Sequence, residues 1–114
     1  MAAKIALVSP VVNSYQVHVK AYAVGSAEVT LDNTITGSTP ISYMASESAT
    51  FDDAYWQPYT KSPVFTLNSG NGMKTIYFKV QDGSLKQSAV VYERIWFNKG
   101  RILYRTNGDF GTRG

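Results

Sequence analysis

The chain has 114 residues, enough for one domain with one core and too few for a multidomain enzyme. Hydrophobic residues make up 44% and charged residues 17%, which excludes a disordered or coiled-coil chain, and the absence of cysteine excludes disulfides, thiolate catalysis and cysteine-based metal sites. The net charge of +3 comes from the C-terminal part: residues 1–97 carry seven basic and seven acidic side chains, whereas residues 98–114 carry four basic and one acidic.

Apolar and polar residues alternate with a period of two along most of the chain, which is typical of β-strands with one buried face. No segment places apolar residues at helical spacing over the ten or more positions that a helix needs. The strands predicted in this way are residues 4–8, 16–24, 28–36, 41–46, 64–67, 74–81 and 87–96. Their number and spacing favour an all-β fold, a single antiparallel β-sandwich of about seven strands.

The same alternation selects a core, because every second residue of a strand faces the opposite sheet. The strand at 87–96 has large side chains on both faces, so the pattern leaves its buried face open. The expected core residues are Val17, Val19, Val29, Leu31, Ile35, Tyr43, Trp56, Ile76, Phe78 and Val80.

Turn-forming residues separate the predicted strands. Gly37-Ser38-Thr39-Pro40 ends the strand at 28–36, and residues 47–62 form an irregular connection with at most one helical turn near 48–54. The strongest signal is Ser69-Gly70-Asn71-Gly72, because Asn-Gly accepts the positive φ angles of primed hairpin turns. It predicts a hairpin between 64–67 and 74–81.

Three stretches of the chain resemble bacterial immunoglobulin-like modules related to fibronectin type III domains, which occur as repeats in surface proteins and polysaccharide-degrading systems. These stretches are Ile41–Ser48, the Trp-x-x-Tyr pattern at Trp56–Tyr59, and Phe65–Asp82 with its Ser-Gly-x-Gly-x-Lys pattern. The resemblance covers roughly residues 28–95 and implies an immunoglobulin-like β-sandwich. It implies no single activity, because such modules serve as spacers, binders and decorations.

The chain departs from this family pattern at both ends. We therefore expect an N-terminal arm at 1–15, the immunoglobulin-like sandwich at 16–97, and a basic C-terminal tail at 98–114.

The residues that enzymes and metal sites require are scarce. His18 is the only histidine, and the strand alternation places it on a polar face, where a solvated side chain is the simpler interpretation. Asp52-Asp53 is compatible with a calcium site or a glycosidase pair, but adjacent acids in a polar connection are typical turn formers. No catalytic residue, metal or cofactor is therefore expected.

Trp56 and Tyr59 are the candidate surface aromatics. They could form a platform for a sugar ring or a protein partner, whereas the simpler interpretation is that Trp56 closes one end of the core.

The C-terminal tail is the candidate partner-binding segment. Its alternatives are a frayed end, which its glycines favour, and a docking arm, which its apolar residues favour. In the docking interpretation, apolar anchors supply affinity and basic residues steer association with an acidic surface. The candidate residues are Lys99, Arg101, Ile102, Leu103, Tyr104, Arg105, Phe110 and Arg113.

Two functions of different kinds fit these features. The first is a non-catalytic accessory (decoration) protein on the surface of a phage capsid, bound to the lattice of the major capsid protein and through edge strands to a second copy; the lack of an export signal in residues 1–15 favours it. The second is a spacer or glycan-binding module of a secreted bacterial surface or carbohydrate-active protein. Nucleic acid is not favoured because four tail charges on a neutral body give a small footprint, and Ile5–Val8 is too short to cross a membrane.

Overall fold

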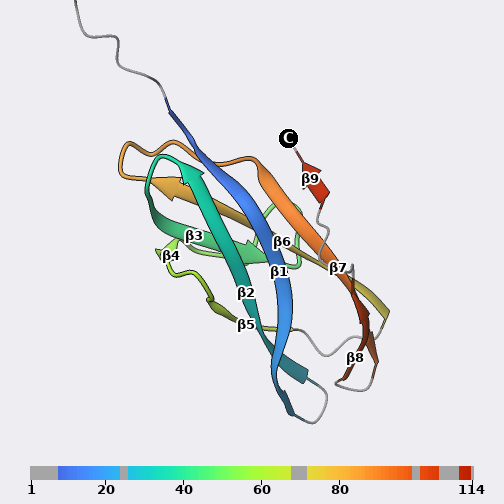
Figure 1. Cartoon of the computed structure of the whole chain (residues 1–114). Coiled ribbons are helices and arrows are strands. Elements are labelled where there is room, and N and C mark those ends of the chain that lie inside the picture. Colours follow the sequence, from blue (N-terminus) through green and yellow to red (C-terminus); the bar gives the residue numbers. More distant parts are fainter. Residues whose placement is uncertain (1–7, 24–25, 68–71, 99–100, 106–110, 114) are drawn as a thin grey trace, which may run out of the picture.

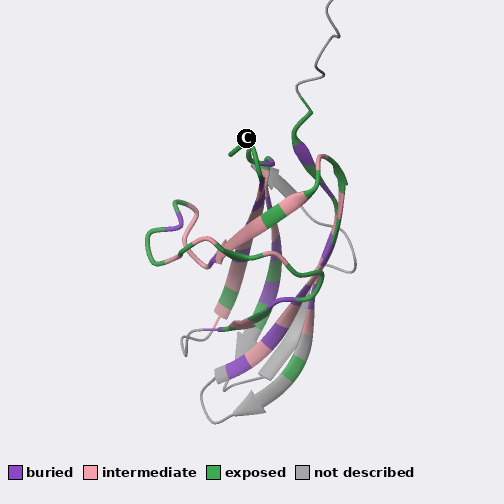
Figure 2. Ribbon diagram, turned by 90° about the vertical axis from the view of Figure 1, so that its left-hand side faces the viewer, coloured by how far each residue is buried: buried purple, intermediate pink, exposed green. Residues whose placement is uncertain are grey.

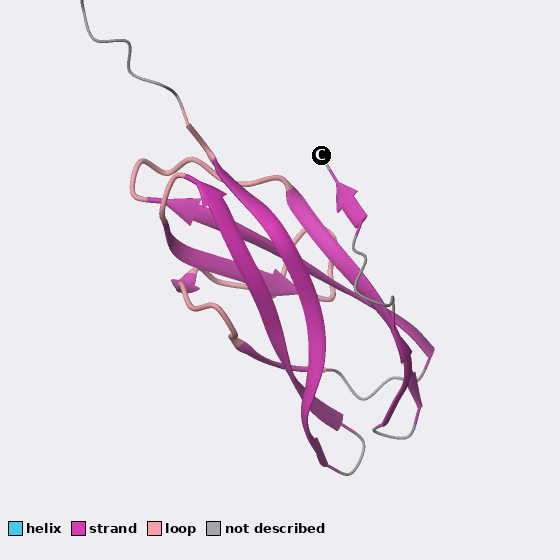
Figure 3. Ribbon diagram, in the orientation of Figure 1, coloured by secondary structure: helices cyan, strands magenta, loops and turns pink. Residues whose placement is uncertain are grey.

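The computed structural model describes residues 8–23, 26–67, 72–98, 101–105 and 111–113. These residues form strands and loops without a helix (Figure 3), so the all-β prediction is confirmed. The strands are β1 (Pro10–Ala23), β2 (Ser26–Gly37), β3 (Pro40–Ser46), β4 (Gln57–Pro58), β5 (Val64–Thr66), β6 (Gly72–Asp82), β7 (Val90–Asn98), β8 (Arg101–Arg105) and β9 (Gly111–Arg113).

The strands form two antiparallel sheets (Figure 1). In the first sheet the order is β1-β2-β5, and in the second it is β4-β3-β6-β7-β8, with β9 also paired to β7. Figure 2 shows buried positions alternating with intermediate and exposed ones along the strands, as expected for sheets with one buried face.

The first strand is longer than predicted, because β1 begins at Pro10 and pairs there with Gly37. Residues 10–15, assigned to the N-terminal arm, therefore belong to the first sheet. The reason is a register shift between Val12 and Ser14, a β-bulge that interrupts the period of two, so that Val12, Tyr15 and Val17 are all buried. Of the short strand predicted at 4–8, only Val8 is described, and it lies in an exposed loop.

The connection at 69–72 does not form the predicted hairpin. Strand β5 pairs with β2 in the first sheet, whereas β6 pairs with β3 and β7 in the second. The chain therefore passes from one sheet to the other here. Gly72 has a φ of +115°, a backbone conformation that favours glycine. It adopts this conformation at the crossing between the sheets and not in a hairpin turn.

Two segments of the predicted C-terminal tail belong to the second sheet. Strand β8 pairs with β7 from Ile95 to Asn98, and β9 pairs with β7 from Val90 to Tyr92. Both segments thus lie along the side of β7 that faces away from β6, so residues 101–105 and 111–113 extend the sheet and do not form a free arm.

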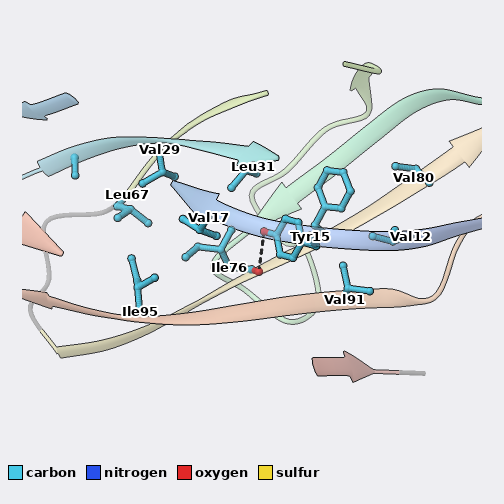
Figure 4. Close-up of a cluster of buried hydrophobic side chains, with 12 residues drawn as sticks. Val12, Tyr15, Val17, Val29, Leu31, Leu67, Ile76, Val80, Val91 and Ile95 are labelled. Atoms are coloured by element: carbon cyan, nitrogen blue, oxygen red, sulfur yellow. Dashed lines mark hydrogen bonds between the residues drawn. The ribbon is translucent and has the colours of Figure 1, made fainter. Parts of the chain in front are cut away.

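Side chains from both sheets meet in one buried core (Figure 4). Ile35 and Tyr43 pack at the margin of this core, the side chain of Val19 lies outside the described residues, and Trp56 is only partly buried, outside the cluster. The prediction that Trp56 closes one end of the core was therefore wrong. The predicted core residues that are buried are Val17, Val29, Leu31, Ile76, Phe78 and Val80.

Polar groups tie the two sheets together inside the core. The hydroxyl of Tyr15 donates to the carbonyl of Ile76 at 3.1 Å, across from β1 to β6 (Figure 4). The amide of Val17 donates to Oε1 of Glu93 at 2.7 Å, from β1 to β7. Because Glu93 is 1% exposed, the face of β7 that the sequence left open carries one carboxyl group among its buried residues.

Candidate binding face

The outer face of the second sheet, which points away from the first sheet, carries an unusual set of side chains. Since Ile76 and Phe78 of β6 point into the core, their neighbours in the strand point outward. The register places Met73 opposite Trp96 and Tyr77 opposite Tyr92. Aromatic and large apolar residues therefore lie in adjacent pairs on two neighbouring strands.

The cationic side chains described on this face, those of Lys79 and Arg94, lie against aromatic rings. Nζ of Lys79 is 4.7 Å from the ring centroid of Phe51 and 5.4 Å from that of Trp56. Cζ of Arg94 is 5.3 Å from the ring centroid of Tyr92. Cation–π attraction at these distances holds the basic groups close to the sheet.

We call this surface the cation–aromatic face. Its residues are Phe51, Trp56, Met73, Tyr77, Lys79, Tyr92, Arg94 and Trp96.

The connection after β3 supplies the two aromatic residues that flank Lys79. The amide of Phe51 donates to the Ser48 carbonyl at 3.0 Å, and the amide of Ala54 donates to the Phe51 carbonyl at 3.1 Å. The sequence predicted at most one helical turn near 48–54, and the structure has these successive turns there. Phe51 has a φ of 56° and is 8% exposed, so a left-handed backbone places its ring over the sheet.

Three members of the face are open to solvent: Arg94 is exposed, and the apolar Met73 and Trp96 are 52% and 42% exposed. Tyr77 and Tyr92 are partly buried, with ring centroids 5.9 Å apart. Single exposed apolar residues are common on soluble proteins, but clustered ones mark interaction sites. The clustering here follows from register, because Met73 and Trp96 are cross-strand partners.

The outward strand positions that the structure describes on this face are basic, aromatic, apolar or neutral polar. On β3 the outward residues next to β6 are Ser42, Met44 and Ser46. At the margin of the face, Oδ1 of Asp53 accepts a hydrogen bond from Ser46 at 2.6 Å. The described residues of this face therefore combine basic and aromatic side chains.

Six of the eight predicted partner-binding residues of the tail lie in strands beside this face. Tyr104 of β8 is the register partner of Trp96, and Arg105 that of Ile95. Arg101, Ile102 and Leu103 are also in β8, and Arg113 is in β9. The side chains of β8 and β9, and all of Lys99 and Phe110, lie outside the described residues.

The two predicted surface aromatics have different surroundings. The hydroxyl of Tyr59 donates to Oδ1 of Asn33 at 2.7 Å, and its ring packs against the core. Nδ2 of the buried Asn33 donates in turn to the Leu31 carbonyl at 2.9 Å. Burial raises the pKa of the Tyr59 phenol. Tyr59 thus anchors the connection before β5, whereas Trp56 belongs to the cation–aromatic face.

His18 has a partner that the sequence did not reveal. Its Nδ1 is hydrogen-bonded to Oδ2 of Asp32 on the outer face of the first sheet, where both side chains are about 40% exposed. Burial raises the pKa of Asp32, but hydrogen bonds from Ser62 and His18 outweigh it and the net pKa is lowered. This is a surface pair between β1 and β2.

Charged groups also lie between the sheets. Nζ of Lys74 is 2.9 Å from Oε1 of Glu47, with side chains that are 9% and 15% exposed. Burial raises the pKa of the Tyr15 phenol well above its ordinary value, and the charge of Glu93 raises it further. These groups join strands and their connections, and sequence alternation could not identify them because it treats charged residues as outward-facing.

Among the described residues, no group of three or more His, Cys, Asp or Glu side chains is placed to hold a metal ion. The described part of the chain also contains no helix long and apolar enough to span a membrane.

Comparison of the chain with protein-family models, with curated proteins and with solved structures found no match.

Proposed function

We propose that this protein is a non-catalytic interaction domain that docks on an acidic protein surface through its cation–aromatic face. The observation that carries the proposal is the cross-strand pairing of exposed Trp96 and Met73, next to Arg94, whose guanidinium lies over the ring of Tyr92. Tryptophan, tyrosine and arginine are the residue types enriched at interface hot spots. A positive face also accelerates association with a negative partner.

We propose in addition that the fold is an immunoglobulin-like sandwich. Strands β1, β2 and β5 share one sheet, and β3, β6 and β7 share the other, with β4 beside β3. Strands A, B and E and strands C, F and G of immunoglobulin-like domains are divided between sheets in the same way, with C′ joining the second sheet in variable-type domains. In this assignment β8 and β9 are additions beside strand G.

The biological setting that we propose is the surface of a phage capsid, where the domain would act as an accessory decoration protein. The support is the resemblance to immunoglobulin-like modules together with a basic face suited to an acidic lattice. The alternative setting is a module of a secreted bacterial surface or carbohydrate-active protein. Co-sedimentation with particles assembled from a major capsid protein encoded beside this gene tests the first setting, and a neighbouring polysaccharide-utilisation system favours the second.

The docking face is tested with charge-matched variants. Arg94→Gln and Lys20→Gln each remove one positive charge, but Lys20 is on β1 of the first sheet, where its Nζ lies 3.8 Å from Glu28. Binding of an acidic polypeptide such as poly-glutamate is measured by fluorescence anisotropy at several salt concentrations. We expect Arg94→Gln and Trp96→Ala to weaken binding and Lys20→Gln to leave it unchanged.

The outcomes separate the classes of partner. Equal losses for Arg94→Gln and Lys20→Gln would show that only net charge matters and would overturn the assignment of the face. Stronger binding of a single-stranded oligonucleotide than of the acidic polypeptide, with the loss again at Trp96, would make the face a base-stacking platform and overturn the choice of a protein partner. Thermal melting of each variant confirms that it is folded.

A further inference from the structure

A second site adjoins the cation–aromatic face, at the edge where β3 of the second sheet approaches β5 of the first. A cavity of about 150 Å³ opens there. This edge is thinly covered, because β4 pairs with β3 only at Ser42 and Tyr43, and β5 pairs with β2 only from Glu28 to Thr30.

The cavity has an apolar floor. Tyr43 and Ala45 come from β3, and Val64 and Phe65 from β5. The rings of Tyr43 and Phe65 also pack against the core, which fixes the floor in place. A ligand in the cavity therefore meets carbon atoms and aromatic rings below it.

The rim of the cavity is polar and comes from one short segment, residues 53–57. Asp53, Tyr55 and Gln57 line the cavity, whereas Trp56 between them lies over Lys79 on the cation–aromatic face. Tyr55 is 79% exposed, although it is a large aromatic residue. The extended segment thus divides its side chains between two surfaces.

The rim groups have hydrogen-bonding capacity to spare. Within the described part of the chain, neither the Tyr55 hydroxyl nor the side-chain amide of Gln57 takes part in a hydrogen bond. The Asp53 carboxylate accepts one, from Ser46 through Oδ1. A carboxylate offers several acceptor sites and an amide offers two donors and an acceptor. The residues around the opening therefore offer a carboxylate, a side-chain amide and a phenol with unused donors and acceptors.

This combination selects a ligand with an apolar face and a rim of hydroxyl groups. A cavity of about 150 Å³ is large enough for one six-membered ring. The lining contains no basic side chain, and the carboxylate of Asp53 repels anions. A sulfated or carboxylated ring is therefore disfavoured, whereas a neutral pyranose satisfies all these conditions.

We propose that the cavity between β3 and β5 binds one neutral pyranose ring, as the terminal sugar of a glycan. Tyr55 stacks on the carbon face of the ring, and Asp53 and Gln57 bind its hydroxyl groups. A single ring in an open cavity is expected to bind with a Kd on the order of 1 mM. The proposal does not depend on the docking function of the cation–aromatic face.

The experiment is a titration of the full-length chain, labelled with ¹⁵N, with methyl glycosides of glucose, galactose and mannose, followed by NMR chemical-shift changes. At least one glycoside is expected to shift the amide signals of residues 43–45, 53–57 and 64–66 in a saturable manner. Glucuronate is the anionic probe and is expected to bind less tightly than the neutral glycoside.

Substitutions of the rim residues test whether they bind the sugar. Tyr55→Ala is expected to raise the Kd roughly tenfold through lost stacking. Gln57→Ala tests hydroxyl recognition without disturbing the Asp53–Ser46 hydrogen bond. Trp96→Ala is the matched control, because it removes an exposed aromatic residue of the other face and is expected to leave sugar binding unchanged while weakening acidic polypeptide binding.

Three results would overturn the proposal. They are the absence of saturable shifts with all three glycosides in a folded wild-type chain, shifts that map elsewhere, and glucuronate binding as tightly as the neutral sugars. A loss of sugar binding in Trp96→Ala but not in Tyr55→Ala would move any sugar site to the other face. None of these outcomes bears on acidic polypeptide binding, so the two proposals fail separately.

Discussion

Replacing Phe78 by alanine removes the side chain at the centre of the core. Phe78 is fully buried, and its ring stacks on Tyr15 at a centroid distance of 5.0 Å and lies 5.9 Å from Tyr43. Buried Phe-to-Ala substitutions cost about 3–5 kcal/mol, and each aromatic pair contributes about 0.5–1.5 kcal/mol beyond buried area. Two aromatic neighbours place the expected loss in the free energy of unfolding at the upper part of this range, about 4–5 kcal/mol.

The assay is urea unfolding followed by tryptophan fluorescence. Because the free energy of unfolding falls by about 1–3 kcal/mol per molar urea, the urea midpoint is expected to fall by at least about 1.3 M. Met73→Ala is the control on the same strand, because Met73 is 52% exposed on the outer face, and its loss is expected to stay below about 1 kcal/mol. A Phe78→Ala loss below about 1 kcal/mol, or one no greater than that of Met73→Ala, would refute the packing described for the core.

Three further substitutions probe polar contacts and backbone strain. Tyr15→Phe deletes the hydroxyl that donates to the Ile76 carbonyl, and a loss of about 0.5–1.5 kcal/mol in urea unfolding is expected; an unchanged midpoint would mean that this bond contributes nothing. Asp82 has a lowered pKa because it accepts hydrogen bonds from Ser38, Lys86 and Ser84, so its stabilising contribution is present above the unfolded-state pKa of about 3.9 and is lost as the pH falls through the folded-state value. Asp82→Asn is expected to flatten the acid side of the stability–pH curve, and an identical curve would contradict the role of the carboxylate. Leu85 has a φ of 68° and is 72% exposed, so Leu85→Gly is expected to raise stability by up to about 1 kcal/mol through relief of left-handed strain, and a lower melting temperature would show that the leucine side chain stabilises the turn.

Strict alternation of apolar and polar residues identified most of the core strands. It failed where a β-bulge interrupts the alternation or where a strand has large residues on both faces. The β-bulge at Val12–Ser14 hid the first half of β1 and, with it, Tyr15. On β7, large residues occur on both faces, so only packing against the first sheet selects Val91 and Ile95 as inward-facing. Sequence patterns describe one strand at a time, whereas these features depend on its neighbours.

The cation–aromatic face was likewise only partly predictable from the sequence. Alternation in β6 already placed Tyr77 and Lys79 on the polar side of the strand. It could not show that Trp96 lies opposite Met73, or that Phe51 reaches Lys79 from a distant connection, because register and loop packing are tertiary properties. The strand pairing of the tail escaped prediction for the same reason, since its partner β7 is defined only once the sheet has formed.

The carboxylate of Glu93 has a consequence for self-association. Strand β1 lies at the border of the first sheet and, among the described residues, pairs only with β2. A border strand with open amides is a template on which a second chain can add and aggregate. The amide of Val17 is occupied by Oε1 of Glu93 from the opposite sheet. An incoming strand would have to displace a buried acid at that point, so the inward-pointing charge protects this border against chain-to-chain pairing.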